Sequence, residues 1–201
     1  MTTTIEWIKQ LREQTQAGVL DCRRALEQAN GNYEQALAHL RKQAEAEAAK
    51  RANHLASQGR IELYSHGSGR IGVMVEINTE TDFAGRSELL RSFAHEVALH
   101  IAAAAPRYVR DEDIPAQVLE DETLKAATWA RSEGKAEGLI PRIVEGYLKK
   151  LKNEQVLLRQ PYIRDDQITI AQLLSQTAAS VGENIVIRRF ARWELAEGET
   201  N

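Results

Sequence analysis

The sequence predicts an α+β protein in which helices cover one side of a small antiparallel sheet. Two β-branched, apolar segments occur early, at Ile61–Tyr64 and Ile71–Ile77, and a third closes the chain at Ile185–Leu195. Helical stripes lie between the second segment and the third. Early strands, helices in the middle and a strand that returns late are typical of this class.

Three short helical patterns occupy residues 1 to about 43. The second and third patterns repeat apolar residues at i, i+3, i+4 and i+7, and each follows a residue of capping type, Asp21 or Asn32. Asn30-Gly31 separates these two patterns as a helix stop. The apolar positions of the three patterns are Trp7, Ile8, Leu11, Cys22, Ala25, Leu26, Ala29, Tyr33, Ala36, Leu37 and Leu40.

A run rich in alanine and charge, Ala44–Ala56, shows no apolar stripe and predicts a linker that can be helical but buries little surface. We therefore expect a three-helix domain with its linker at residues 1–53 and an α+β core at residues 54–201. In the core, the glycine-rich segment Ser65–Arg70 joins the first two predicted strands as a hairpin.

Four helical stripes follow in the core. The first runs from Leu90 to about Ala105, the second from Pro115 toward Trp129, the third from Ile140 to Leu151 and the fourth from Ile170 to Val181. Pro106 stops the first stripe, and Thr169 is placed to cap the fourth. The strand Ile185–Leu195 is expected to pair with the two early strands.

An acidic residue and a large aromatic, Asp82 and Phe83, stand at the corner between the second strand and the first core helix. Local chemistry favours a structural role, with Phe83 buried under the corner and Asp82 capping the helix. The alternative is an exposed pair that contacts a partner. The local pattern alone leaves both open.

Composition narrows the classes of function. A net charge of −3 with scattered basic residues argues against a nucleic-acid partner. A single cysteine, Cys22, suits a reducing compartment and the role of a small buried apolar group. The amino-terminal residues show no signal peptide, and no apolar run approaches the ~20 residues of a membrane span. We expect a cytoplasmic protein.

Candidate catalytic and metal-binding patterns are weak. His95 and His100 are five residues apart, so they diverge on a helix instead of sharing a face as zinc ligands do. Glu80 and Asp82 are two residues apart at a corner, with no nucleophile or cleft to make them an acid/base pair. We therefore predict no enzyme activity, no metal and no cofactor.

Four segments resemble the signature segments of the elongation factor Ts family, the guanine nucleotide exchange factors of elongation factor Tu. In chain order they are Gln14–Leu26, Thr81-Asp82-Phe83, Gln160–Asp166 and Gly182–Phe190. Two departures are apolar replacements: Ala84 stands where the family usually has valine, and Val19-Leu20 stand where it has two methionines. The resemblance implies an amino-terminal domain similar to a ubiquitin-associated domain.

The resemblance also implies a function and a set of partner-binding residues. Elongation factor Tu, GDP-bound or nucleotide-free, is the implied partner, and release of GDP through disturbance of the magnesium and phosphate site is the implied activity. Phe83 would wedge between two helices of the partner, and Asp82 would disturb the magnesium environment. The implied contact residues are Val19, Leu20, His66, Thr81, Asp82, Phe83, Val181 and Gly182.

Some of these residues have structural alternatives. Val19 and Leu20 could staple the second helix, Gly182 could be a helix stop, and His66 could be a polar turn residue. Two other functions stay open: a ubiquitin-associated-type adaptor, or a ribosome-associated binding protein without exchange activity.

The resemblance further predicts a homodimer. Longer family members carry two core halves, whereas these 201 residues hold one unit with both the Asp82-Phe83 corner and the His66-Gly67 hairpin. A second chain is expected to supply the missing half through association of the sheets or their edges.

Overall fold

The computed structural model describes residues 4–197, so the outer ends of the two predicted domains, residues 1–3 and 198–201, lie outside the described residues. Contacts divide the chain into two compact units, one formed by residues 1–102 with 171–201 and the other by residues 103–170. The division predicted between residues 53 and 54 falls inside the first unit and stays a prediction.

The first unit begins with three helices, as predicted: α1 (Thr4–Thr15), α2 (Val19–Gln28) and α3 (Tyr33–Arg51). Asn32 caps α3, because its side chain accepts a hydrogen bond from the backbone N–H of Gln35 at 3.0 Å. Asp21 was expected to cap α2, but the helix begins earlier, with Gly18 at the N-cap and Asp21 in the first turn. Together with the sheet described below, these helices confirm the predicted α+β class. The likeness of the three helices to a ubiquitin-associated domain stays a prediction.

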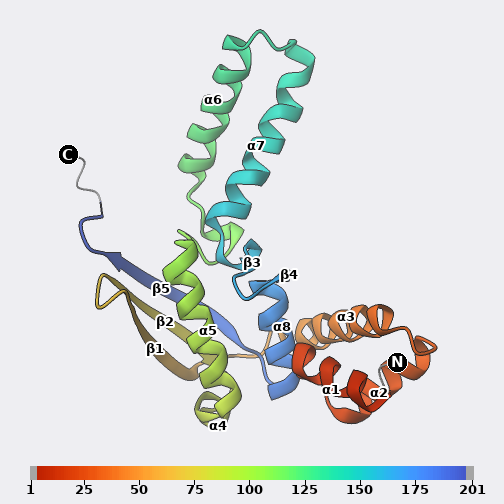
Figure 1. The fold of residues 1–201 in the computed structure, drawn as a ribbon. Helices are drawn as coiled ribbons and strands as arrows, with labels where there is room; N and C mark the ends of the chain where they lie inside the picture. The colour runs from red at the N-terminus through yellow and green to blue at the C-terminus, as the bar shows by residue number, and fades with distance from the viewer. Residues whose placement is uncertain (1–3, 198–201) are drawn as a thin grey trace. The chain divides into compact units, whose positions relative to one another are not determined.

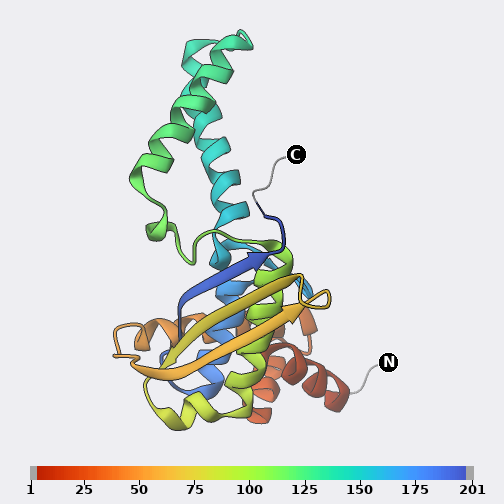
Figure 2. The same ribbon diagram turned by 90° about the vertical axis from the view of Figure 1, so that its left-hand side faces the viewer.

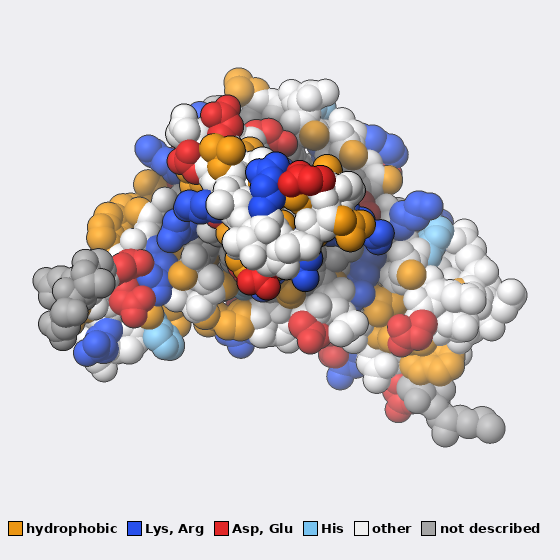
Figure 3. Space-filling view, turned by 90° about the horizontal axis from the view of Figure 1, so that it is seen from above, with side chains coloured by type: hydrophobic (Ala, Val, Ile, Leu, Met, Phe, Trp, Pro, Cys, Tyr) orange, Lys and Arg blue, Asp and Glu red, His pale blue; other side chains and the backbone are white. Residues whose placement is uncertain are grey.

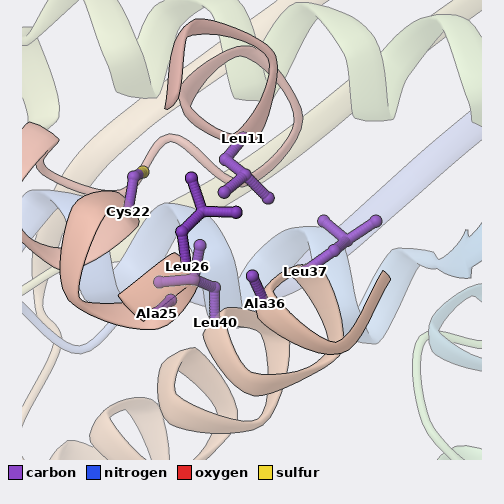
Figure 4. Packing of buried hydrophobic residues seen from close by; sticks show 7 residues of the cluster. All are labelled: Leu11, Cys22, Ala25, Leu26, Ala36, Leu37 and Leu40. Atoms are coloured by element: carbon purple, nitrogen blue, oxygen red, sulfur yellow. The ribbon is translucent and has the colours of Figure 1, made fainter. Parts of the chain in front are cut away.

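A cluster of buried side chains holds the three helices together (Figure 4). It consists of Leu11, Cys22, Ala25, Leu26, Ala36, Leu37 and Leu40. Cys22 is fully buried among them, which confirms its predicted role as a small apolar group, and burial raises the pKa of its thiol. Beyond the cluster, α3 continues to Arg51, so part of the expected linker is helical and its Ala44 is buried.

The sheet of this unit consists of β1 (Gln58–His66), β2 (Ile71–Thr79) and β5 (Val186–Glu194). Among the described residues the strand order is β1-β2-β5, and both pairs are antiparallel. All three predicted strands are therefore confirmed, and the hairpin between β1 and β2 lies where the glycine-rich segment predicts it.

The two faces of the sheet differ. Val73, Val75 and Ile77 of β2 are buried on the face covered by α5 (Glu88–Ala104), which lies behind the sheet in Figure 2. The opposite face is turned toward the viewer in Figure 2 and carries large apolar side chains that are more than a third exposed. They are Ile61, Leu63, Met74 and Trp193, and we call this surface the open sheet face.

Helix α8 (Ile170–Val181) leads from β4 into the segment before β5. Two hydrogen bonds join it to the amino-terminal segment, one to the turn after α1 and one to α3. Ser180 donates to the carbonyl oxygen of Gln16 at 3.1 Å, and the Gln172 amide donates to the Glu45 carboxylate at 3.1 Å. Thr169, the expected cap of α8, is the last residue of β4.

In the second unit, α6 (Ala116–Ser132) and α7 (Ile140–Gln155) run antiparallel as a helical hairpin (Figure 1), and both match predicted stripes. Tyr147 of α7 donates to the Glu122 carboxylate of α6 at 2.6 Å. The sequence did not predict the small pair of strands β3 (Pro161–Tyr162) and β4 (Asp165–Thr169). Short 3-10 turns complete the unit at Asp111–Asp113, Glu137–Leu139 and Leu157–Arg159.

Two surface properties bear on partners. No helix within residues 4–197 has both the length and the apolar character that crossing a membrane requires. Acidic and basic side chains are intermixed on the face drawn in Figure 3. The expectation that nucleic acid is not a partner stays a prediction.

Candidate functional site

The predicted corner exists and contains a helix of its own. Strand β2 ends at Thr79, and the short helix α4 (Asp82–Arg86) begins three residues later. Thr81 is its N-cap, since the Thr81 hydroxyl accepts from the backbone N–H of Ala84 at 3.3 Å. The prediction that Asp82 caps the helix is therefore wrong. Asp82 is the first helical residue, and its carboxylate lies 3.0 Å from the guanidinium of Arg86.

Phe83 is not part of the core, contrary to what local chemistry favoured. Its side chain is 82% exposed, whereas the two small residues that follow it, Ala84 and Gly85, are buried. Helix α4 thus turns its small residues toward the sheet and its phenyl ring toward solvent. We call Phe83 the wedge.

Gly85 allows α4 to lie directly on the start of β1, and Gly59 allows the start of β1 to lie close to β2. A Cβ atom on Gly85 would stand 3.0 Å from backbone atoms of Gly59, and a Cβ on Gly59 would overlap the carbonyl oxygen of Ile77. Gly59 also has φ of +132°, a conformation that other residues rarely adopt. Glycine within a strand pattern is the sequence signal for such a close approach.

The segment after α8 is hydrogen-bonded to the corner through Glu183 and Asn184. The Glu183 carboxylate accepts two hydrogen bonds from Thr81, one from the backbone N–H at 3.0 Å and one from the hydroxyl at 2.5 Å. The backbone N–H of Asn184 donates to the Glu80 carboxylate at 2.6 Å. We call these three hydrogen bonds the clasp. The clasp brings together two of the four segments that carry the family resemblance.

A second set of contacts joins the corner to His54, near the end of the predicted linker. Nδ1 of His54 lies 3.1 Å from Oε2 of Glu80, and the Asn184 amide donates to the carbonyl oxygens of His54 and Ala52 at 2.8 and 3.4 Å. The Asn184 hydrogen bond, followed by the His54 contact, lowers the pKa of the Glu80 carboxyl. The lowered pKa favours the charged carboxylate, which accepts the hydrogen bond from Asn184 at the corner.

Val181 and Gly182 stand just before the clasp. Val181 ends α8, and Gly182 has φ of +77° and donates its backbone N–H to Ala178 at 2.8 Å. This is the geometry of a helix stop, as the structural alternative proposed. It places both residues beside Glu183 and hence next to the corner.

Val19 and Leu20 open α2 with exposed side chains, 49% and 64% respectively. Neither belongs to the buried cluster of the three helices, and Ala17 and Cys22 pack there instead. The exposed pair forms an apolar tip at the start of the helix.

His66 lies at the other end of the β1–β2 hairpin. Its Nδ1 is 3.1 Å from the Tyr64 hydroxyl, and the two rings are stacked with centroids 6.1 Å apart. His66 pairs with Ile71, whereas Gln58 pairs with Thr79 beside the corner, so eight strand residues separate the two ends. That separation is about 26 Å at roughly 3.3 Å per residue. One chain therefore does not bring His66 to Phe83.

At this corner an exposed aromatic side chain, Phe83, stands on a short helix whose first residues are held by hydrogen bonds. His95, considered as a metal ligand, is 3.6 Å from Glu62, and no group of three or more potential metal ligands occurs among residues 4–197.

Comparison of the sequence with known proteins identifies the family of this chain. Residues 6–197 match the family described as "Elongation factor TS". The chain is 49% identical over 195 residues to elongation factor Ts of Carboxydothermus hydrogenoformans, covering 97% of this chain and 90% of that protein. It is 50% identical over 191 residues to elongation factor Ts of Caldanaerobacter subterraneus subsp. tengcongensis, covering 95% and 96%. The chain belongs to the elongation factor Ts family, and its role is that of a translation elongation factor.

Proposed function

We propose that this chain binds GDP-bound elongation factor Tu and promotes release of GDP, so that GTP can be loaded. The observation that carries the proposal is the exposure of the Phe83 wedge, 82%, on a corner held by Glu183. Membership of the family supports the role, and the match of Thr81-Asp82-Phe83 to a family signature supports the site.

The mechanism acts on the magnesium and phosphate end of the nucleotide. Bound guanine nucleotides are held by a phosphate loop and by Mg²⁺, whose shell includes a phosphate oxygen. Phe83 enters between two helices of the partner, and Asp82 disturbs the magnesium environment. The Asp82 carboxylate pairs with Arg86 on the surface, where such pairs contribute only about 0–1 kcal/mol, so docking can redirect it at small cost.

Reciprocal coupling makes the factor catalytic. If the factor weakens nucleotide binding tenfold, about 1.4 kcal/mol, a bound nucleotide weakens the factor's own binding by the same amount. GTP binding therefore ejects the factor after exchange, and the factor is not consumed.

Further contacts come from the apolar tip and from the end of α8. Val19 and Leu20 dock on the partner. Their apolar side chains are exposed and do not pack in the core of this chain, so they are available for an interface. Val181 and Gly182 contact it beside the corner. Thr81 contributes at the edge of the same surface.

A homodimer completes the site. Since His66 and Phe83 lie at opposite ends of a hairpin about 26 Å long, we assign them to opposite sides of a composite site, with His66 of one subunit and Phe83 of the other facing each partner. The open sheet face is the dimer surface, with Ile61, Leu63, Met74 and Trp193 exposed on it.

We place this function in the cytoplasm, without nucleic acid or membrane as partner. The net charge of −3 lacks the excess of basic residues that phosphate backbones attract, and Cys22 is buried as a free thiol.

Release of a fluorescent GDP analogue from elongation factor Tu tests the function. The parent chain should accelerate release, and Phe83→Ala should reduce the acceleration at least tenfold with thermal unfolding nearly unchanged, because the ring is exposed. Leu139→Ala is the matched control, since it removes an apolar side chain that is 53% exposed in the second unit. Full activity of Phe83→Ala, or a large loss of its stability, would contradict the proposal.

A further inference from the structure

Two of the three hydrogen bonds of the clasp join Glu183 to Thr81, the residue that leads into the helix carrying Phe83. Each polar group of Thr81 is bonded: its N–H and hydroxyl donate to Glu183, and its carbonyl oxygen accepts from the Thr79 hydroxyl at 2.7 Å. The same hydroxyl oxygen accepts from the N–H of Ala84, which starts α4. The carboxylate of Glu183 therefore fixes the residue that fixes the first turn of the helix carrying Phe83.

A wedge that is 82% exposed is not oriented by packing of its own ring. Its direction depends on the backbone of α4, which has five residues and is too short to be stable by itself. The start of α4 is held by Thr81 and its underside by the close approach of Gly85 to Gly59. Removal of the Glu183 carboxylate leaves the N-cap without its outer support.

We infer that Glu183 is a positioning residue for nucleotide exchange: it acts through Thr81 to hold Phe83 in the orientation that enters the partner. Asn184 supports the same corner through Glu80. The inference rests on the proposed function. It assigns to Glu183 a task in the exchange reaction without placing it in contact with the partner.

A positioning role differs measurably from a contact or from a general contribution to folding. A positioning residue has an effect only while the group that it positions is present. A residue that merely stabilises the fold shifts the unfolding temperature, and its effect on exchange multiplies with that of any other substitution.

The experiment is a double-mutant cycle on the full chain with Glu183→Ala and Phe83→Ala, read by kcat/KM for release of a fluorescent GDP analogue from elongation factor Tu. Glu183→Ala should lower kcat/KM about fivefold or more in the parent and less than twofold in the Phe83→Ala chain. Glu183→Gln keeps one acceptor oxygen for Thr81 and should lie between the parent and Glu183→Ala. The control Glu145→Ala removes an exposed carboxylate of α7 and should match the parent.

A second measurement needs no partner. Amide hydrogen exchange of residues 79–85 should accelerate in Glu183→Ala and not in Glu145→Ala, with the unfolding temperature of both close to that of the parent. Losses that multiply in the cycle, unchanged protection of residues 79–85, or a Glu183→Gln chain equal to Glu183→Ala would overturn the positioning role. If Phe83→Ala itself exchanges like the parent, the proposed function fails. If Phe83→Ala is impaired and Glu183→Ala is not, the positioning role alone fails.

Discussion

At the scale of single residues, Phe83 is the position where local chemistry and structure disagree. Burial of a phenyl ring contributes about 1.5–3 kcal/mol, and the isolated chain forgoes most of it by leaving the ring 82% exposed. Ala84 and Gly85 take the inward positions because α4 lies so close to Gly59 that only small residues fit there. The exposed ring thus follows from the close approach of two backbones.

Asp82 and Arg86 test the electrostatic part of the mechanism. Asp82→Ala should reduce exchange less than Phe83→Ala does, because it removes one carboxylate from a solvated site and leaves the wedge in place. Arg86→Ala should leave exchange within about twofold of the parent or raise it, since it removes the cation that competes for the Asp82 carboxylate. GDP-analogue release measures both. A loss in Arg86→Ala as large as that in Asp82→Ala would mean that the ion pair itself is needed.

Glu80 predicts a pH dependence of stability. Its pKa is lowered in the folded state, first by the Asn184 N–H and then by His54, so the folded chain binds fewer protons than the unfolded chain. The resulting stabilisation is present above the ordinary value of 4.5 and is lost as the pH falls through the lower folded-state value. Glu80→Gln should therefore unfold at lower temperature than the parent near pH 7, and the two should converge in acid. A gap in unfolding temperature that persists unchanged in acid would contradict this assignment.

At the scale of helices and strands, periodic segments were predictable and aperiodic ones were not. The three strands of the sheet and the stripes of α5, α6, α7 and α8 carry enough repeats to be recognised. Strand β3 has two residues and α4 has five, too few for any period to show. The alanine-rich end of α3 lacks an apolar stripe, but alanine itself favours helix, so α3 extends to Arg51.

The candidate site shows the same limit. The corner and its residues were identified from the sequence, whereas the clasp was not, because Glu183 and Thr81 are 102 residues apart and no local pattern links them. The segment Gly182-Glu183-Asn184 carries the family resemblance, but its sequence does not indicate what the Glu183 carboxylate contacts. The exposure of the Phe83 side chain could not be predicted from the local sequence either, because a large aromatic residue shortly after an apolar strand is usually buried.

The amino-terminal helices can be tested as a docking element. Deletion of residues 1–53 should leave a folded core whose affinity for elongation factor Tu is much weaker, because the tip Val19-Leu20 and its tethered, high effective concentration are lost. Circular dichroism would follow folding and titration would follow affinity. Val19→Ala with Leu20→Ala in the full chain is the matched control and should weaken binding with the fold intact. Aggregation of the truncated chain would show that the predicted division at residue 53 is wrong.

At the scale of the whole molecule, the open sheet face and the separation of His66 from Phe83 predict a shared site. A Phe83→Ala chain mixed with a His66→Ala chain should recover exchange activity to about a quarter of the parent's. Half of the randomly mixed dimers are heterodimers, and each of these has one intact composite site of two. GDP-analogue release before and after mixing measures the recovery, and light scattering measures the mass. A monomer at micromolar concentration, or no recovery although both single variants are impaired, would refute the shared site.

The separation of 102 positions in sequence from Thr81 to Glu183 also sets an order of events during synthesis. Chains emerge and fold from the amino terminus, so Asp82 and Phe83 leave the ribosome long before the carboxylate that fixes their corner has been made. Until α8 and Glu183 follow, the wedge stands on an unsupported turn. If the chain has the proposed function, a half-made chain is poorly shaped to engage elongation factor Tu. Competence for exchange would then arrive late, together with the strand that completes the sheet.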